Sequence, residues 1–176
     1  MGGAMNTDNE IRSALDRARK AVEQRPSVAV GTVTLKLEMG EAIKCATEVD
    51  GWSLELDEPV SMGGENSAPG PYVHGFSAIA SCFAMTLRML AIQKGVVVEK
   101  ISVVVEGDYD DRAFFDVGDA RTGYHSIRLK ADVASDADIE VIESLVSEAR
   151  RKSPWLNTFA NQNAIETELV VKGQLT

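Results

Sequence analysis

One cysteine lies in a segment whose other residues are almost all apolar. Cys82 belongs to the stretch AIASCFAMTLRMLAIQKG, residues 78 to 95. A cysteine reacts as a thiolate, and apolar surroundings disfavour the thiolate unless a cation or a hydrogen-bond donor stabilises it. Cys82 is therefore either a small core residue or a nucleophile that draws on a partner elsewhere in the fold.

Few polar residues of the sequence can act on this thiol. Arg88 lies six residues further on, roughly 240° around a helix, and so faces away from Cys82. A cation must come from Lys44, Arg112 or a second chain. His74 precedes Cys82 by about 12 Å of helix rise, too far for a direct hydrogen bond, but it stays a candidate base or donor to a bound oxygen.

The second cysteine also has two interpretations. Cys45 shares one side of an expected strand with Ile43, Thr47 and Val49, so alternation alone explains it as a packing residue. Its other interpretation is a resolving thiol. A disulfide would require its Cα to lie within about 7 Å of the Cα of Cys82, in the same chain or across a dimer.

No signature of a metal or nucleotide site accompanies these residues. The two cysteines, His74 and His125 have no metal-ligand spacing. The GGEN segment lacks the order of a phosphate-binding loop, and no GxGxxG motif is present. We expect neither a metal nor a cofactor. An apolar substrate pocket over the thiol could be lined by aromatic and sulfur-bearing residues, which otherwise form core: Tyr72, Phe76, Phe83, Met89 and Trp155.

The composition limits the function further. The chain has 176 residues, a net charge of −9 and a pI near 4.7. It should repel polyanions, so nucleic acids and anionic membranes are not expected partners. No apolar run approaches a membrane span, and no signal peptide is visible. A cytoplasmic location and reduced cysteines are expected.

The elements that position these residues can be read from periodicity and from turn signals. A helix is expected over 8–24 and strands over 27–39, 42–49 and 52–58, with a type I′ hairpin turn at Asp50-Gly51. Residues 58–71 form a loop rich in glycine and proline. A central helix over 72–94 follows, apolar on nearly every side, and it must be covered on most faces.

The second half continues with alternating strand and helix patterns. Strands are expected over 96–109 and around 124–133, and a helix over 136–152. A short helix over 153–161 should have Ser153 as its cap, and 164–173 should be a closing strand. This predicts α+β architecture in a single domain, 1–176, with residues 1–7 either disordered or of vector origin.

Several motifs occur here in the order found in one known family. They are DEP at 57–59, GGEN at 63–66, Pro71 eleven residues before Cys82, and the run CFAMTLRMLAIQKG. The chain resembles the OsmC-like family, which comprises osmotically inducible protein C and the organic hydroperoxide resistance proteins. The resemblance extends from about Thr32 to Val171 and includes the Ser153-Pro154 pair.

This resemblance implies an OsmC-like fold with a three-stranded antiparallel meander, a long buried central helix and a second three-stranded sheet with helices. It also implies an intertwined homodimer. Family enzymes are thiol peroxidases that reduce organic hydroperoxides, and Cys82 matches their peroxidatic cysteine. A second cysteine resolves the sulfenic acid, an arginine and a glutamate orient the thiolate, and an external dithiol such as dihydrolipoamide restores it.

The chain departs from the family pattern at three places. Ser153 stands where the resolving cysteine is expected, and Tyr72 and Val73 stand where the glutamate is expected. The arginine has no clear counterpart, although Lys44 lies in the right neighbourhood. Two functions stay open: a peroxidase acting through Cys82 with an unusual resolving thiol, or a non-enzymatic relative that binds an apolar small molecule or a partner.

Overall fold

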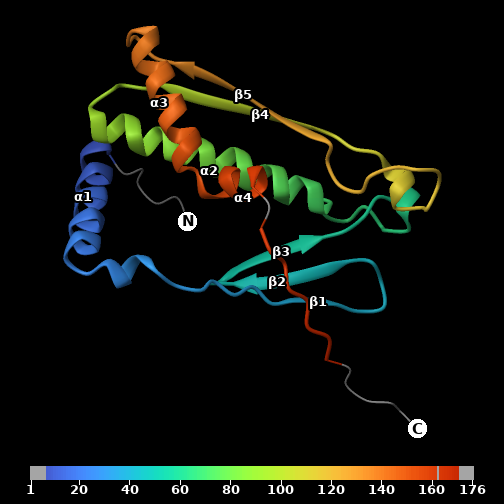
Figure 1. Ribbon diagram of the computed structural model, residues 1–176. Coiled ribbons are helices and arrows are strands. Elements are labelled where there is room, and N and C mark those ends of the chain that lie inside the picture. Colours follow the sequence, from blue (N-terminus) through green and yellow to red (C-terminus); the bar gives the residue numbers. More distant parts are fainter. Residues whose placement is uncertain (1–6, 162, 171–176) are drawn as a thin grey trace.

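A long helix runs through the middle of the molecule, with a helix and a β-hairpin on one side and a separate sheet on the other (Figure 1). The computed structural model describes residues 7–161 and 163–170 of the 176-residue chain. The helix is α2, Pro71–Lys94. The antiparallel hairpin of β4 and β5 and the three-stranded sheet β1-β2-β3 give an α+β fold.

A proline and a glycine determine where α2 begins and ends. Pro71 occupies the first turn, where its missing N–H costs nothing, and Gly70 precedes it in an extended conformation. At the other end Gly95 takes a left-handed conformation, with a φ of 72°. Its N–H donates hydrogen bonds to the carbonyl oxygens of Ala91 and Ile92. The expected central helix is thus confirmed to within one residue.

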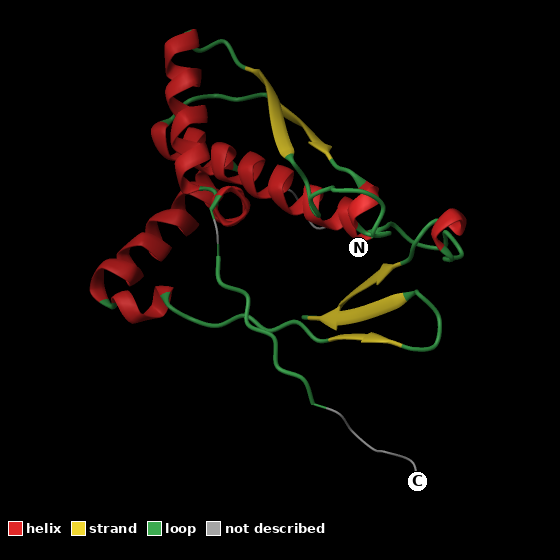
Figure 2. Cartoon of the chain, turned by 45° about the vertical axis from the view of Figure 1, so that its right-hand side comes forward, coloured by secondary structure: helices red, strands yellow, loops and turns green. Residues whose placement is uncertain are grey.

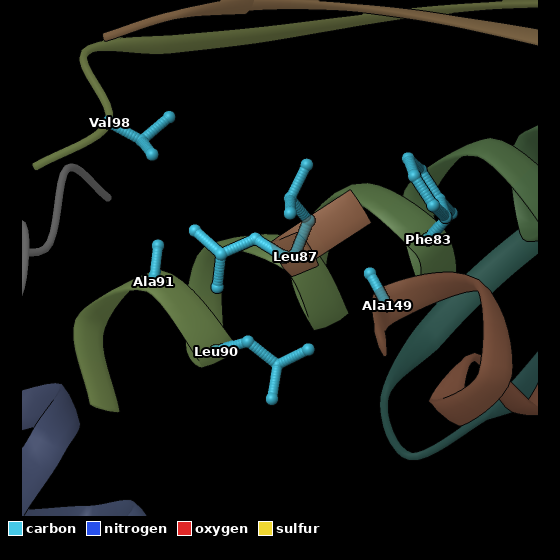
Figure 3. Close-up of a cluster of buried hydrophobic side chains, with 7 residues drawn as sticks. Phe83, Leu87, Leu90, Ala91, Val98 and Ala149 are labelled. Atoms are coloured by element: carbon cyan, nitrogen blue, oxygen red, sulfur yellow. The ribbon is translucent and has the colours of Figure 1, made fainter. Parts of the chain in front are cut away.

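One face of α2 supplies most of the hydrophobic core. Phe83, Leu87 and Leu90 of α2 pack with Val98 and with Ala149 of α3, as Figure 3 shows. Strands β4 (Lys100–Asp108) and β5 (Ser126–Ala134) pair along their whole length, from Lys100 with Ala134 to Asp108 with Ser126. Apolar side chains of this hairpin cover the same cluster.

Three further helices pack against α2. They are α1 (Asp8–Gln24), α3 (Ile139–Lys152) and α4 (Pro154–Ala160). Thr7 caps α1 in a capping box with Glu10. The expectation for residues 1–7 stays a prediction, because residues 1–6 lie outside the described residues. Arg88 of α2 bonds to the carbonyl of Val98 and pairs with Asp8 of α1 at 2.9 Å, which fixes that end of the helical layer.

The remaining sheet is a meander of β1 (Leu37–Met39), β2 (Cys45–Val49) and β3 (Trp52–Leu56). Its hairpin turn has positive φ at Asp50, 52°, and at Gly51, 79°, as predicted. The views in Figures 1 and 2 both place this sheet apart from α2. Thr47 is its buried residue, and the apolar side chains of β1 and β3 are mostly exposed.

Two expected strands are corrected by the structure. The strand predicted over 27–39 is a 3₁₀ turn at Pro26–Ala29, an unpaired extended segment and the short strand β1. The predicted third strand of the second sheet is not formed by residues 163–170, and 171–173 lie outside the described residues. Neither segment pairs with another strand among the residues that the structure describes, and a strand without hydrogen-bonding partners has little to hold it.

The expectation that no apolar run approaches a membrane span is also corrected. Within the described part of the chain, α2 is long and apolar enough to cross a membrane by length and composition. The core helix of a soluble protein satisfies the same criterion, and a third of the relevant window of α2 is buried inside the fold.

Candidate active site

Cys82 lies at the border between the buried and the uncovered sides of α2. Ile79 and Phe83, its neighbours on one side, are 1% and 2% exposed. On its other side Met85 is 60% exposed and Met89 is 43% exposed. The thiol is half-buried, so it is shielded by apolar atoms and open to a reactant that approaches along the uncovered side.

The loop before α2 is built around one carboxylate. Asp57 is 2% exposed and accepts hydrogen bonds from the backbone N–H groups of Glu58, Glu65 and Ser67 at 2.8 to 3.2 Å. It also accepts one from the Ser67 hydroxyl, at 2.9 Å. The Ser67 N–H contributes most to holding the pKa of Asp57 below its usual value, and the other hydrogen bonds act in the same direction.

A glycine in the same loop explains part of the GGEN motif. A Cβ on Gly64 would lie 1.9 Å from the carbonyl oxygen of Glu58, so no larger residue fits there without moving the backbone. At least one glycine of the motif is therefore required by the tight loop itself. Its function is to bring Gly70 and Pro71 to the position where α2 begins.

An aromatic cluster covers the first turns of α2. Phe76 lies 6.4 Å from Tyr72 and 4.9 Å from Tyr124, measured between ring centroids. Gly107 of β4 makes room for it, since a Cβ there would lie 2.5 Å from the Phe76 ring and 2.7 Å from Tyr124. Burial raises the pKa of the Tyr124 hydroxyl, which therefore stays protonated and able to donate.

A cavity of about 420 Å³ lies between β5, α4 and the start of α2. Ile79 contributes from α2, Tyr124 from the end of the β4–β5 loop, and Phe159 from α4. Cys82 is not part of its lining. Neither are the aromatic residues expected to line a pocket over the thiol, namely Tyr72, Phe76, Phe83 and Trp155.

Those four aromatic residues lie in different surroundings. Tyr72 is exposed, Phe76 belongs to the aromatic cluster and Phe83 is in the core. Trp155 is half-exposed and lies 6.1 Å from Phe159, between ring centroids. The pocket that they would form over Cys82 stays a prediction.

The residues proposed to assist the thiol are not gathered around it within one chain. Cys45 and Lys44 lie at the start of β2, in the sheet that stands apart from α2 (Figure 2). The ammonium of Lys44 already pairs with Glu55 at 3.2 Å. Arg112 is bound to Asp110 in the loop after β4, and this pair lowers the pKa of Asp110 to about 2.

The two histidines differ in their partners. His125 Nε2 lies 2.9 Å from the carbonyl oxygen of Arg121, a bond within its own loop. His74, on the first turn of α2, has a buried Nε2 with no hydrogen-bond partner among the described residues. No group of three or more His, Cys, Asp or Glu in the described part of the chain is arranged to hold a metal ion.

Ser153 is at the junction of α3 and α4, both of which pack on α2. It occupies the cap position of α4, as predicted, but its side chain makes no capping bond. The residue is fully buried and its hydroxyl has no partner among the described residues. Asn157 reaches back instead and donates to the Ser153 carbonyl oxygen at 2.7 Å.

Residues 64–168 match the family model described as OsmC-like protein, which is well over half of the 176-residue chain. The chain belongs to the OsmC-like family. The matched region contains the second half of the Asp57 loop, all of α2 and both helices that follow the β4–β5 hairpin. No curated protein matches this OsmC-like chain.

Solved structures confirm the OsmC-like fold. An OsmC-like protein from Mycoplasma pneumoniae is 19% identical, with 74% of this chain and 88% of that chain covered and a TM-score of 0.63. An organic hydroperoxide resistance protein OsmC from Legionella pneumophila is 21% identical, with 74% and 91% covered and a TM-score of 0.54. A hydroperoxide resistance protein from Vibrio cholerae that has captopril bound in one of its active sites is 17% identical, with 73% and 85% covered and a TM-score of 0.51.

Sequence reasoning missed several residues of this region. Asp57 organises the loop before α2, yet the sequence identified only its motif. Tyr124 and Arg150 contribute to the cavity from different elements, and no spacing in the sequence connects them. Their shared surroundings arise because α3 and α4 pack on α2 and on each other, and β5 lines the same cavity.

Proposed function

We propose that this OsmC-like protein reduces organic hydroperoxides through Cys82. The observation that carries the proposal is the position of Cys82 within the family motif, half-buried at the edge of the uncovered apolar side of α2. An apolar approach favours an alkyl or aryl hydroperoxide over hydrogen peroxide. The hydroperoxide resistance proteins from Legionella pneumophila and Vibrio cholerae have the same fold, which supports a role in this chemistry.

The proposed reaction has two stages. The Cys82 thiolate attacks the outer oxygen of the hydroperoxide, the O–O bond breaks, and the alcohol leaves after taking up a proton. Cys82 is then a sulfenic acid. A thiol of an external dithiol condenses with it and releases water, and the second thiol displaces Cys82 as the dithiol becomes a disulfide. Cytoplasmic reductants would supply this dithiol.

A homodimer belongs to the proposal because one chain leaves its apolar surfaces uncovered. Among the described residues, Met85 of α2 is 60% exposed, Met89 of α2 is 43% exposed and Trp52 of β3 is 74% exposed. A second copy that brought its sheet over this side of α2 would bury both surfaces at once. It would also decide which residues face Cys82, including Lys44 and Cys45 of the other chain.

The absence of a cysteine at position 153 determines what happens to the Cys82 sulfenic acid after oxidation. Ser153 cannot form a disulfide, and Cys45 of the same chain lies in a sheet that stands apart from α2. Only Cys45 of the partner, with its Cα within about 7 Å, could resolve the sulfenic acid within the protein. Otherwise the sulfenic acid waits for the external dithiol and can be trapped.

A second candidate function is binding without chemistry on the same side of α2. It is favoured by Tyr72 and Ser153, which stand at the positions of the family's glutamate and resolving cysteine. A thiol without these helpers would be a poor nucleophile, and the uncovered apolar side would then receive an apolar small molecule or a protein partner.

Intact mass spectrometry distinguishes the two functions. The protein is treated with one equivalent of cumene hydroperoxide in the presence of a sulfenic-acid trap, alongside Cys82→Ser and Cys45→Ser variants. A peroxidase gives a trapped adduct in Cys45→Ser and none in Cys82→Ser, and the native protein gives the adduct or, where the partner's Cys45 resolves the sulfenic acid, a disulfide. If Cys82 stays reduced while a small model thiol is oxidised under the same conditions, the peroxidase function is wrong and binding is favoured.

A further inference from the structure

The cavity between β5 and α4 is separate from the side of α2 that exposes Cys82. Its volume of about 420 Å³ is within the range of small-molecule sites. Cys82 does not line it, so the peroxide chemistry proposed above does not account for it. The cavity lies on the covered side of α2, where Ile79 forms part of its wall.

The walls are mainly aliphatic and aromatic. They are formed by side chains from α2, β5 and α4: Ile79, Ile127, Leu129, Leu156, Phe159 and Ala160. Trp155 packs against Phe159 from outside the lining and supports that wall. An apolar chain bound here would move from water into apolar surroundings. This removal of apolar surface from water is the main source of affinity in small sites.

One cation is available at this cavity. Arg150 of α3 is part of the lining, and its guanidinium forms no ion pair with the described residues. The basic residue two positions further on behaves differently, because Lys152 pairs with Glu148 at 2.7 Å. Of the other polar side chains of the wall, His125 has its Nε2 at 2.9 Å from the carbonyl oxygen of Arg121, and the Ser126 hydroxyl accepts a hydrogen bond from Arg128. In a chain of net charge −9, a free arginine beside an apolar cavity is a site for an anion.

We propose that this cavity binds a small amphipathic carboxylate, with its aliphatic chain among the apolar side chains and its carboxylate paired with Arg150. The planar guanidinium can donate two parallel hydrogen bonds to a carboxylate. A single arginine suits a single negative charge better than a phosphate ester, which usually draws on several donors. The proposal does not depend on the reactivity of Cys82.

Isothermal titration calorimetry with octanoate tests this site in the full-length protein, with no peroxide present. Octanoate should bind about tenfold more tightly than 1-octanol, which has the same chain length and no charge. Arg150→Gln, which removes the charge and leaves a shorter polar side chain, should lower octanoate affinity about tenfold and leave 1-octanol affinity unchanged. Arg151→Gln is the matched control, because Arg151 is exposed on the same turn and is not part of the lining.

A second variant tests the apolar part of the site. Ala160→Leu places a larger side chain at the cavity wall and should weaken both octanoate and 1-octanol. The proposal is overturned if octanoate does not bind at millimolar concentration or if 1-octanol binds equally well. It is also overturned if Arg150→Gln and Arg151→Gln have the same effect, or if Ala160→Leu leaves both affinities intact. Circular dichroism and thermal unfolding confirm that each variant is folded.

Discussion

The helical layer and the β1-β2-β3 sheet bury their apolar residues to very different extents. In the helical layer, Phe83, Leu87 and Leu145 are at most 2% exposed. In the β1-β2-β3 sheet, Leu37 is 44% exposed and Leu54 is 39% exposed. Both parts carry the apolar periodicity of a core. The difference shows that the sheet has a core-forming surface that one chain does not use.

The largest expected effect comes from truncating a residue of the helical layer. Leu87→Ala should lower the free energy of unfolding by about 3 kcal/mol, because it removes a fully buried side chain and leaves a cavity. Leu54→Ala in the sheet should cost about 1 kcal/mol or less at high dilution. Urea denaturation of both variants measures the contrast, and equal losses would show that the sheet is covered even in dilute solution.

The oligomeric state tests why the sheet is uncovered. Met85→Glu puts a charge on the uncovered side of α2, where a second chain would otherwise exclude water, and it should convert a dimer to monomer. Light scattering after size-exclusion chromatography measures this. Val141→Glu, at a half-exposed position of α3, is the control and should leave the dimer intact. A native protein that is already monomeric at micromolar concentration would contradict the proposed dimer.

Substitutions at two glycines compare how tightly side chains pack around the β4–β5 hairpin and around the β1-β2-β3 sheet. Gly107→Ala should cost about 1–2 kcal/mol, because its Cβ would collide with the Phe76 and Tyr124 rings. Gly51→Ala meets no atom within 4 Å but keeps a φ of 79°, so it should cost about 1 kcal/mol through backbone strain alone. Near-ultraviolet circular dichroism should change in Gly107→Ala and not in Gly51→Ala. The reverse pattern would mean that the aromatic cluster is loosely packed.

Much of the fold could be predicted because local residues determine it. Pro71 and Gly95 mark the two ends of α2. Asp50 and Gly51 favour the type of hairpin turn that is observed, with positive φ at both residues. The strand predicted over 27–39 is too long, and the strand predicted over 164–173 is not formed by residues 164–170, both for a different reason. Alternating apolar residues show that a segment is able to form a strand. A strand forms only where a neighbouring segment supplies hydrogen-bond partners, and the described residues supply none there.

The candidate site was only partly predictable for a related reason. Cys82 could be located because a helix and a motif both fix its position. The aromatic residues expected to surround it, such as Phe83 and Trp155, were chosen by type, and the structure distributes them between the core and the surface. The cavity at Arg150 combines residues from α2, the β4–β5 loop, β5, α3 and α4, and no local pattern in the sequence brings those parts together.

The smallest expected effect concerns the Asp57 loop, which connects the β1-β2-β3 sheet to α2. Asp57→Asn weakens the hydrogen bonds that hold the loop before α2 and should lower the Tm by about 2–4 °C at pH 7. The folded pKa of Asp57 lies below its usual value of 3.8, so its stabilising contribution is present above that value and is lost as the pH falls through the lowered pKa. The difference in Tm between the native protein and Asp57→Asn should therefore shrink in acid.

Thermal unfolding between pH 7 and pH 3 checks this sign, with Glu48→Gln as the control at an exposed carboxylate of β2. The Glu48→Gln curve should follow that of the native protein at every pH. A difference for Asp57→Asn that stays constant in acid would mean that the carboxylate charge does not hold the loop. The loop would then be stabilised by its backbone alone, and Gly64, whose substitution would collide with the Glu58 carbonyl, would be the residue that fixes where α2 begins.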